Sequence, residues 1–181
     1  MLGSFLVPLA LALAGAASPA PGTSPRPFDE ARAEAVARLR TADPSGALAV
    51  LQAAEAPPDA TGRVLAALLA ARAQTGVGRP AEALSTLDRV APGEVPAHLR
   101  PLLDEERAAA HGASKDAASR PALRAFLSRN PRSPRAIEFR LVLARLALQA
   151  GDACEASAVA GEVLASKPVP PRPVRAEALL L

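Results

Sequence analysis

Aromatic residues are almost absent from this sequence of 181 residues, which has no tryptophan, no tyrosine and only four phenylalanines. Aromatic and β-branched side chains are the ones that pleated sheets favour, and no run alternates apolar and polar residues over more than a few positions. The composition therefore does not favour β-strands. Half of the residues are hydrophobic and alanine contributes much of that half, so the composition favours helices that approach one another closely. We expect an all-α chain, long enough for one domain or a short array of repeats.

Lysine is scarce as well, because Lys115 and Lys167 are the only two and arginine carries the rest of the basic charge. The net charge is +3 and the isoelectric point is near 9.9. The arginines alternate with Asp and Glu at helical spacings, as in FDEARAEAVARLR (28–40). This pattern is typical of a solvated helix face rather than of attraction to anionic cell-wall polymers. A clustered basic stripe with stacking aromatic residues is missing, so we expect no nucleic-acid partner.

The single cysteine, Cys154, cannot form a disulfide within the chain. It lies in the alanine-rich stretch GDACEASAV, where we predict a small buried hydrophobic residue in preference to a reactive thiol or an intermolecular bridge.

His98 and His111 are the only histidines and are thirteen positions apart. With one cysteine in another predicted hairpin, they do not make a metal-ligand spacing. We therefore expect no metal and no cofactor.

Catalytic motifs are missing too. The stretch GVGRPAEA (76–83) has two glycines but lacks the Lys-Ser/Thr pair and the preceding strand of a phosphate-binding loop. The acidic run Asp104-Glu105-Glu106 lies among arginines on a predicted helix. We interpret it as surface ion pairing rather than as catalytic carboxyl groups, which need an apolar pocket. We assign no catalytic residue and expect no enzyme activity from this chain alone.

The first residues form a targeting segment. MLGSFLVPLALALAGAASPAPG has an apolar run from Phe5 to Ala14, followed by Ala14-Gly15-Ala16 in the A-x-A pattern of a cleavage site. We predict a signal peptide over residues 1–17, in preference to a buried N-terminal helix, and a proline-rich linker over 18–27. The run is too short to span a bilayer permanently, so no stable membrane span is expected after its removal. The mature chain is then periplasmic or secreted, in a bacterium.

The remaining residues, 28–181, repeat the order helix, tight break, helix and proline about four times. Aligning Gly78 with Gly151, at an offset of 73 residues, brings small residues of the flanking helices into register as well. One further hairpin lies within this offset, so the mean period is about 36, inside the range of helix-turn-helix solenoids. Small residues let helices approach where they cross, and glycine accepts a turn conformation that other residues resist. The residues predicted to have these structural roles are Ala71, Gly78, Ala83, Ala144, Gly151 and Ala156.

These positions carry a resemblance to tetratricopeptide repeats. That family has a small residue in the first helix, glycine at the turn, alanine early in the second helix and proline after it. The matching residues are Ala71, Gly78, Ala83 and Pro92, and again Ala144, Gly151, Ala156 and Pro168. The match is good for the second and last hairpins and poor for the third, and the family's large aromatic positions are absent, so the array is degenerate. The resemblance implies a right-handed superhelix of helical hairpins over residues 28–181, stacked without a central core.

Stacking determines what each apolar stripe packs against. The stripe of residues 83–90 is expected to meet its own hairpin and the first helix of the next, at Leu65, Leu68, Leu69, the stem of Arg72, Leu99, Leu102 and Leu103.

At the end of the chain, RPVRAEALLL starts another first helix at Val174 and leaves the apolar edge 179–181 without a polar capping helix. We therefore expect the array to be incomplete at its C-terminus, a fragment of something longer, with docking of this edge on a partner as the alternative.

The expected function follows from a second resemblance. The array, with NPRSPRA before a first helix and GD at the turn, is similar to the superhelical N-terminal region of soluble lytic murein transglycosylases and to the repeat regions of periplasmic envelope-assembly factors. In the transglycosylases that this array resembles, the catalytic glutamate belongs to a Glu-Ser pair in a separate C-terminal domain. No Glu-Ser pair occurs in these 181 residues, so the resemblance carries over no catalytic residue.

We therefore expect a non-catalytic periplasmic scaffold that binds protein or peptide partners of the cell envelope. The alternative is the non-catalytic N-terminal arm of a peptidoglycan lytic transglycosylase, with peptidoglycan as a ligand, and a purely structural helical domain is a third reading. The inner-face residues predicted to meet a partner are Arg63, Arg72, Arg140 and Arg145.

Overall fold

The computed structural model describes residues 26–116, 118–166 and 170–181, which are mainly helical. Their order is α1 (Phe28–Arg40), α2 (Pro44–Gln52), α3 (Ala60–Gly76), α4 (Pro80–Asp88), the short 3₁₀ turns η1 (Pro92–Glu94) and η2 (Ala97–Leu99), α5 (Arg100–Ser114), α6 (Ser119–Arg129), α7 (Ala136–Gln149), α8 (Ala153–Ala165) and α9 (Arg172–Leu180). Among these described residues, the extended pairing is limited to one bridge between Arg26 and Ala54. The prediction of an all-α chain is confirmed. The predicted signal peptide, 1–17, and the predicted linker up to residue 25 lie outside the described residues.

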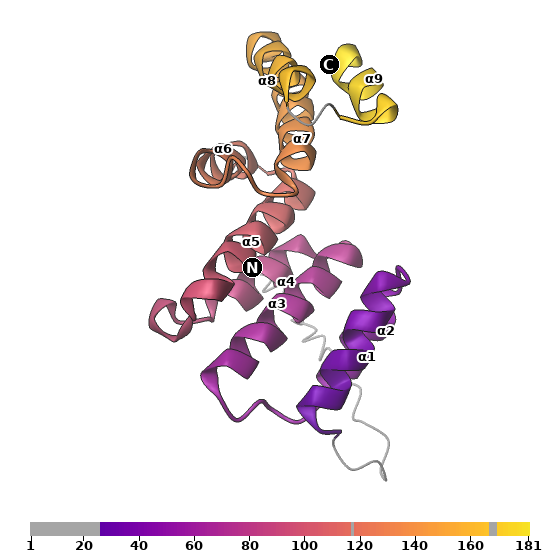
Figure 1. The fold of residues 1–181 in the computed structure, drawn as a ribbon, viewed down its shortest axis with the longest axis vertical. Helices are drawn as coiled ribbons and strands as arrows, with labels where there is room; N and C mark the ends of the chain where they lie inside the picture. The colour runs from indigo at the N-terminus through magenta and orange to yellow at the C-terminus, as the bar shows by residue number, and fades with distance from the viewer. Residues whose placement is uncertain (1–25, 117, 167–169) are drawn as a thin grey trace, which may run out of the picture.

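Helices α1 to α8 form four successive pairs, α1–α2, α3–α4, α5–α6 and α7–α8, and α9 follows the last pair (Figure 1). A turn of three or four residues joins the two helices of each pair. In Figure 1 the pairs follow one another along the molecule, from α1 and α2 toward α8 and α9. The first helix of each pair also contacts the first helix of the next, α1 with α3, α3 with α5 and α5 with α7. The first helices of successive pairs are therefore neighbours in space as well as in order.

The turn inside each pair contains one residue in the left-handed backbone conformation. These residues are Ala42, Gly78, Lys115 and Gly151, with φ of 57°, 77°, 55° and 78°. They are separated by 36, 37 and 36 residues. The third pair, whose sequence matches the repeat pattern poorly, thus has its turn within one residue of the interval that separates the others.

Three of the four turns share the same two backbone hydrogen bonds. After α1, the N–H of Asp43 donates to the carbonyl of Arg38, and the N–H of Ala42 donates to the carbonyl of Leu39. The turns at Gly78 and Gly151 repeat both bonds at equivalent positions. This combination is the Schellman motif, which ends a helix on a left-handed residue. The third turn differs, because the N–H of Lys115 donates to His111, four residues back.

A buried alanine lies seven residues before each left-handed residue. The four are Ala35, Ala71, Ala108 and Ala144, and none is more than 2% exposed. The second helices of the first, second and fourth pairs add the fully buried alanines Ala47, Ala83 and Ala156. Side chains that end at Cβ let paired helices approach closely. In the third pair the equivalent residue is Arg120, which instead reaches α8 and forms ion pairs with Asp152, at 2.6 Å, and with Glu155.

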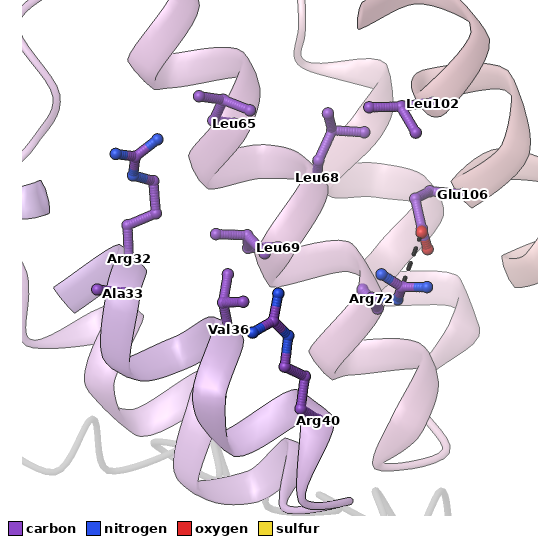
Figure 2. A pocket seen from close by; sticks show the side chains of 10 residues that line it. All are labelled: Arg32, Ala33, Val36, Arg40, Leu65, Leu68, Leu69, Arg72, Leu102 and Glu106. Atoms are coloured by element: carbon purple, nitrogen blue, oxygen red, sulfur yellow. Dashed lines mark ion pairs between the residues drawn. The ribbon is translucent and has the colours of Figure 1, made fainter.

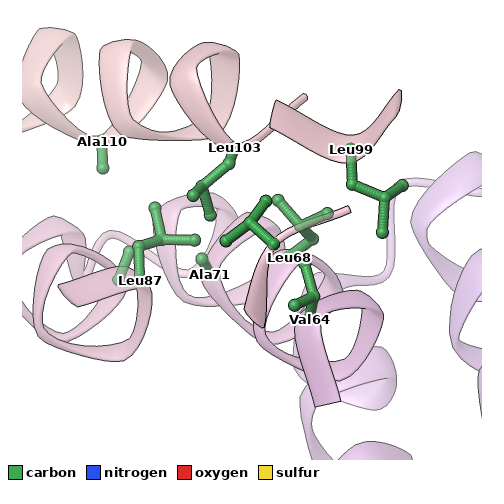
Figure 3. Packing of buried hydrophobic residues seen from close by; sticks show 9 residues of the cluster. Val64, Leu68, Ala71, Leu87, Leu99, Leu103 and Ala110 are labelled. Carbon is green, nitrogen blue, oxygen red and sulfur yellow. The ribbon is translucent and has the colours of Figure 1, made fainter. Parts of the chain in front are cut away.

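Hydrophobic side chains gather in several clusters along the chain. One joins α3 and α4 to α5 and includes Leu68, Leu87 and Leu103 (Figure 3). Another joins α5, α6, α7 and α8 around Phe126 and Phe139, whose rings meet edge to face with centroids 5.0 Å apart. Smaller clusters lie among α1, α2 and α3 and among α7, α8 and α9. Each cluster therefore joins a pair to the helix or the pair that follows it, as in arrays that nearest-neighbour contacts stabilise.

The packing predicted for the stripe of residues 83–90 is partly wrong. Leu87 shares a cluster with Leu68 and Leu103, as expected. Leu69 and Leu102 lie outside that cluster and line a groove on another side of α3 and α5. Leu68 borders both the cluster and the groove, whereas Leu69 points about 100° further around the helix axis and borders the groove only.

Cys154 is exposed, so the prediction of a buried residue is wrong. The buried stripe of α8 runs through Ala156, Val159, Ala160 and Val163, and Cys154 lies outside it near the start of the helix. At the other edge of the chain, α9 leaves Leu179 73% and Leu180 86% exposed.

Candidate partner-binding groove

A groove with a volume of about 460 Å³ lies between α1, α3 and α5. Figure 2 shows its lining: Arg32, Ala33, Val36 and Arg40 from α1, Leu65, Leu68, Leu69 and Arg72 from α3, and Leu102 and Glu106 from α5. A second hollow adjoins it near the C-terminal ends of α1 and α3 and shares Val36, Arg40, Leu69 and Arg72 with it. The first helices of three successive pairs therefore build one continuous surface.

Helical periodicity explains why these side chains meet. Arg32, Val36 and Arg40 are four residues apart and form one stripe of α1. The buried residues of α1, which include Ala31 and Ala35, lie on another stripe. Helix α3 contributes a matching stripe at positions 65, 68, 69 and 72, and α5 contributes one at 102 and 106. Each helix thus buries one face in its own cluster and turns another toward the groove.

The lining is mainly apolar and partly open to water. Leu102 is 48% exposed, while Val36, Leu65 and Leu69 are partly buried. Apolar side chains that converge with a few charged groups in a concave surface are typical of binding sites. A ligand that covers these side chains gains the free energy of removing their surface from water.

The acidic run 104–106 forms ion pairs at Glu105 and Glu106, as interpreted, but Glu106 is buried rather than at the surface. It is only 8% exposed, and its Oε1 lies 3.5 Å from Nε of Arg72 and 4.0 Å from a guanidinium nitrogen of Arg135. Burial raises the pKa of the Glu106 carboxyl, although the charges of Arg72 and Arg135 act in the opposite direction. The carboxyl of Glu106 therefore lies between two cationic side chains, Arg72 of α3 and Arg135, the residue before α7.

Arg135 joins this pair to a wider network. Its guanidinium lies 4.8 Å from the centroid of the Phe139 ring and forms an ion pair with Glu138 at 2.9 Å. The neighbouring carboxylate of Glu105 accepts a hydrogen bond from the hydroxyl of Ser133 at 3.0 Å. The network therefore connects α5 to the start of α7, next to the groove. Every acid in it has a basic or hydroxyl partner.

The four arginines predicted to meet a partner do not come together. Arg72 lines the groove. Arg63 forms an ion pair with Glu94 at 2.9 Å beside a separate hollow near α4. Arg140 pairs with Glu162 at 3.0 Å and Arg145 pairs with Glu177, so both connect α7 to the following helices.

Sequence reasoning missed Arg32, Val36, Arg40 and Leu102 as groove residues. The signal for three of them was available, because Arg32, Val36 and Arg40 recur every four residues in FDEARAEAVARLR. No signal identified which stripe of α1 faces α3, since that depends on how the first two pairs pack.

Within residues 26–116, 118–166 and 170–181, no group of three or more His, Cys, Asp or Glu side chains is arranged to hold a metal ion. None of the described helices combines the length and hydropathy needed to cross a bilayer.

Comparisons with protein-family models, with curated proteins and with solved structures give no match to this chain.

Proposed function

We propose that this chain is an exported helical-repeat scaffold whose groove binds a segment of a protein partner in the cell envelope. The proposal includes the finer architecture, a right-handed superhelix of degenerate tetratricopeptide-like hairpins with the first helices on its inner face. It is supported by left-handed turns and buried alanines that recur every 36 or 37 residues. Export is supported by the apolar run and A-x-A pattern of residues 1–17.

The observation that carries the proposal is the open apolar lining supplied by three first helices. Leu102 projects from α5 toward the same space as Leu65 and Leu69 of α3 (Figure 2). Covering such surface contributes about 25 cal/mol per Å² of apolar area removed from water. Because the lining residues belong to helices that are already packed in cores, little ordering of the groove is needed on binding, which lowers one of the costs of association. The function is binding, and no catalytic step is part of it.

Leu102 and Leu148 provide a matched pair for a test. Both are leucines on first helices, 48% and 44% exposed, and only Leu102 lines the groove. A photo-crosslinking amino acid is placed at position 102 or at 148 in the protein produced in its native cell, and crosslinked peptides are identified by mass spectrometry. We expect adducts from position 102 that map to one segment of one partner, and none of them from position 148.

Two outcomes would contradict the proposal. Adducts of equal yield from both positions would show that the groove has no special role. Retention of the purified protein on peptidoglycan sacculi that is unchanged by Leu102→Asp, together with no adduct at 102, would instead favour a peptidoglycan-associated role through another surface.

A further inference from the structure

The charged groups that line the groove are mostly of one sign. Arg32, Arg40 and Arg72 are basic, and Glu106 is the single acid. The adjoining hollow has only Arg40 and Arg72 as charged lining. Any ligand that covers the apolar lining must therefore place its own groups beside an excess of positive charge.

The acid and the bases of the lining differ in how much of their charge is already compensated. Glu106 is held between Arg72 and Arg135, so its negative charge is balanced within the protein. Arg32 has only an exposed partner, Asp29, at 3.2 Å, and such surface pairs contribute little. Arg40 forms no ion pair with the residues that the structure describes. Two guanidinium groups of α1 are thus available to a ligand at the groove edge.

A second copy of this chain is the first occupant to consider, because Leu179 and Leu180 of α9 are exposed and apolar. Helix α9 also carries Arg172 and Arg175, both exposed. Arg172 and Arg175 share a face of α9 with Leu179, so an α9 docked through that face would add positive charge to a groove that already carries Arg32 and Arg40, and like charges repel at an interface. Charge complementarity therefore favours a different protein with the opposite charge.

We propose that the groove takes an acidic segment of a partner protein, in which Asp or Glu side chains flank leucine-like anchors. This inference rests on the proposed function and adds the chemistry of the partner. The anchors would lie on the apolar stripe that includes Leu69 and Leu102, while the carboxylates meet Arg32 and Arg40 of α1. Guanidinium groups pair with carboxylates through two parallel hydrogen bonds, which gives direction as well as attraction.

The test begins with a displayed library of random peptides selected on the purified protein, with Leu102→Asp protein used to remove peptides that bind elsewhere. We expect the retained peptides to be enriched in Asp and Glu together with Leu, Ile or Phe. Retained peptides that depend on Leu102 but are neutral or basic would overturn the inference while leaving the proposed function intact. A library that yields no Leu102-dependent peptide would count against the proposed function itself.

The retained acidic peptide is then measured by fluorescence anisotropy against two charge-matched variants. Arg32→Gln/Arg40→Gln should weaken binding by about three- to tenfold and flatten its salt dependence. Arg172→Gln/Arg175→Gln, which removes the same charge from α9, should leave binding unchanged. An equal loss of affinity in both variants would show that the peptide responds only to the net charge of the protein. That result would overturn the assignment of the acidic segment to this groove. Self-association of the protein that Leu102→Asp abolishes would show that the occupant is a second copy.

Discussion

Gly78 and Gly151 hold nearly the same left-handed backbone conformation, with φ of 77° and 78°, although 73 residues separate them. A Cβ at either position would meet no atom within 4 Å, so space is not the reason for glycine. The reason is conformational, because an ordinary L-residue costs about 1–2 kcal/mol in this region. Glycine therefore allows the left-handed conformation at the turns of two different pairs.

Replacement of either glycine by alanine should destabilise the protein without any clash. We expect Gly78→Ala and Gly151→Ala each to lower the free energy of unfolding by about 1 kcal/mol. The matched control is Gly161, which lies inside α8 and also has no atom within 4 Å of its Cβ position. There Gly161→Ala should raise the free energy by about 0.5–1 kcal/mol. Urea unfolding gives both values, and equal signs at positions 78 and 161 would refute the argument.

Ala42 offers the reverse experiment, since it holds the left-handed conformation, with φ of 57°, without being glycine. Ala42→Gly removes that strain but gives the unfolded chain more freedom, so a net stabilisation of up to about 1 kcal/mol is expected. Ala37→Gly, at an exposed position inside α1, should destabilise by about 1 kcal/mol. Thermal unfolding of the two variants separates the turn from the helix, and a loss of stability in Ala42→Gly would show that Ala42 is not strained.

These turns show how far the sequence allowed prediction. Glycine identified the turns at Gly78 and Gly151, because no other residue type adopts their conformation so readily. Nothing identified Ala42 or Lys115, since there backbone hydrogen bonds and helix packing impose the same conformation on residues that disfavour it. Local patterns therefore predicted the helices and their period, and tertiary packing decided the exceptions.

The groove was less predictable for the same reason. Glu106 forms ion pairs with Arg72 and Arg135, which lie more than a helix away in the sequence. The misplacement of Cys154 has a different origin: in an alanine-rich helix many stripes are equally apolar, so the pattern does not indicate which one is buried.

Glu106 should make stability depend on pH in an unusual direction. Burial raises the pKa of this carboxyl in the folded protein, so the folded state takes up its proton more readily than the unfolded state. Its stabilising contribution is therefore complete below the usual carboxyl pKa and is lost as pH rises through the raised pKa. Denaturation curves between about pH 4 and 7 should show wild type gaining stability relative to Glu106→Gln as the pH falls.

Glu34 is the control for that experiment, because the hydrogen bond from Arg38 lowers the pKa of its carboxyl. Its contribution is present above the usual carboxyl pKa and is lost as pH falls through the lowered value. Relative to Glu34→Gln, wild type should therefore lose stability on the acid side. If the two differences had the same sign, the assignment of Glu106 as a carboxyl with a raised pKa would be wrong.

Separate clusters along the chain predict that a core mutation acts locally. Phe139 is 2% exposed and packs edge to face on Phe126, so Phe139→Ala should cost about 3–5 kcal/mol in the cluster of α5 to α8. The proposed stack of pairs would make stability a sum over neighbouring units, so hydrogen exchange should accelerate in α6, α7 and α8 far more than in α1 and α2. Leu164→Ala, at a position 36% exposed on α8, should change exchange little anywhere. Equal acceleration in α2 and α7 would mean that the chain unfolds as one cooperative unit, and the array would then be a single domain rather than a stack of pairs.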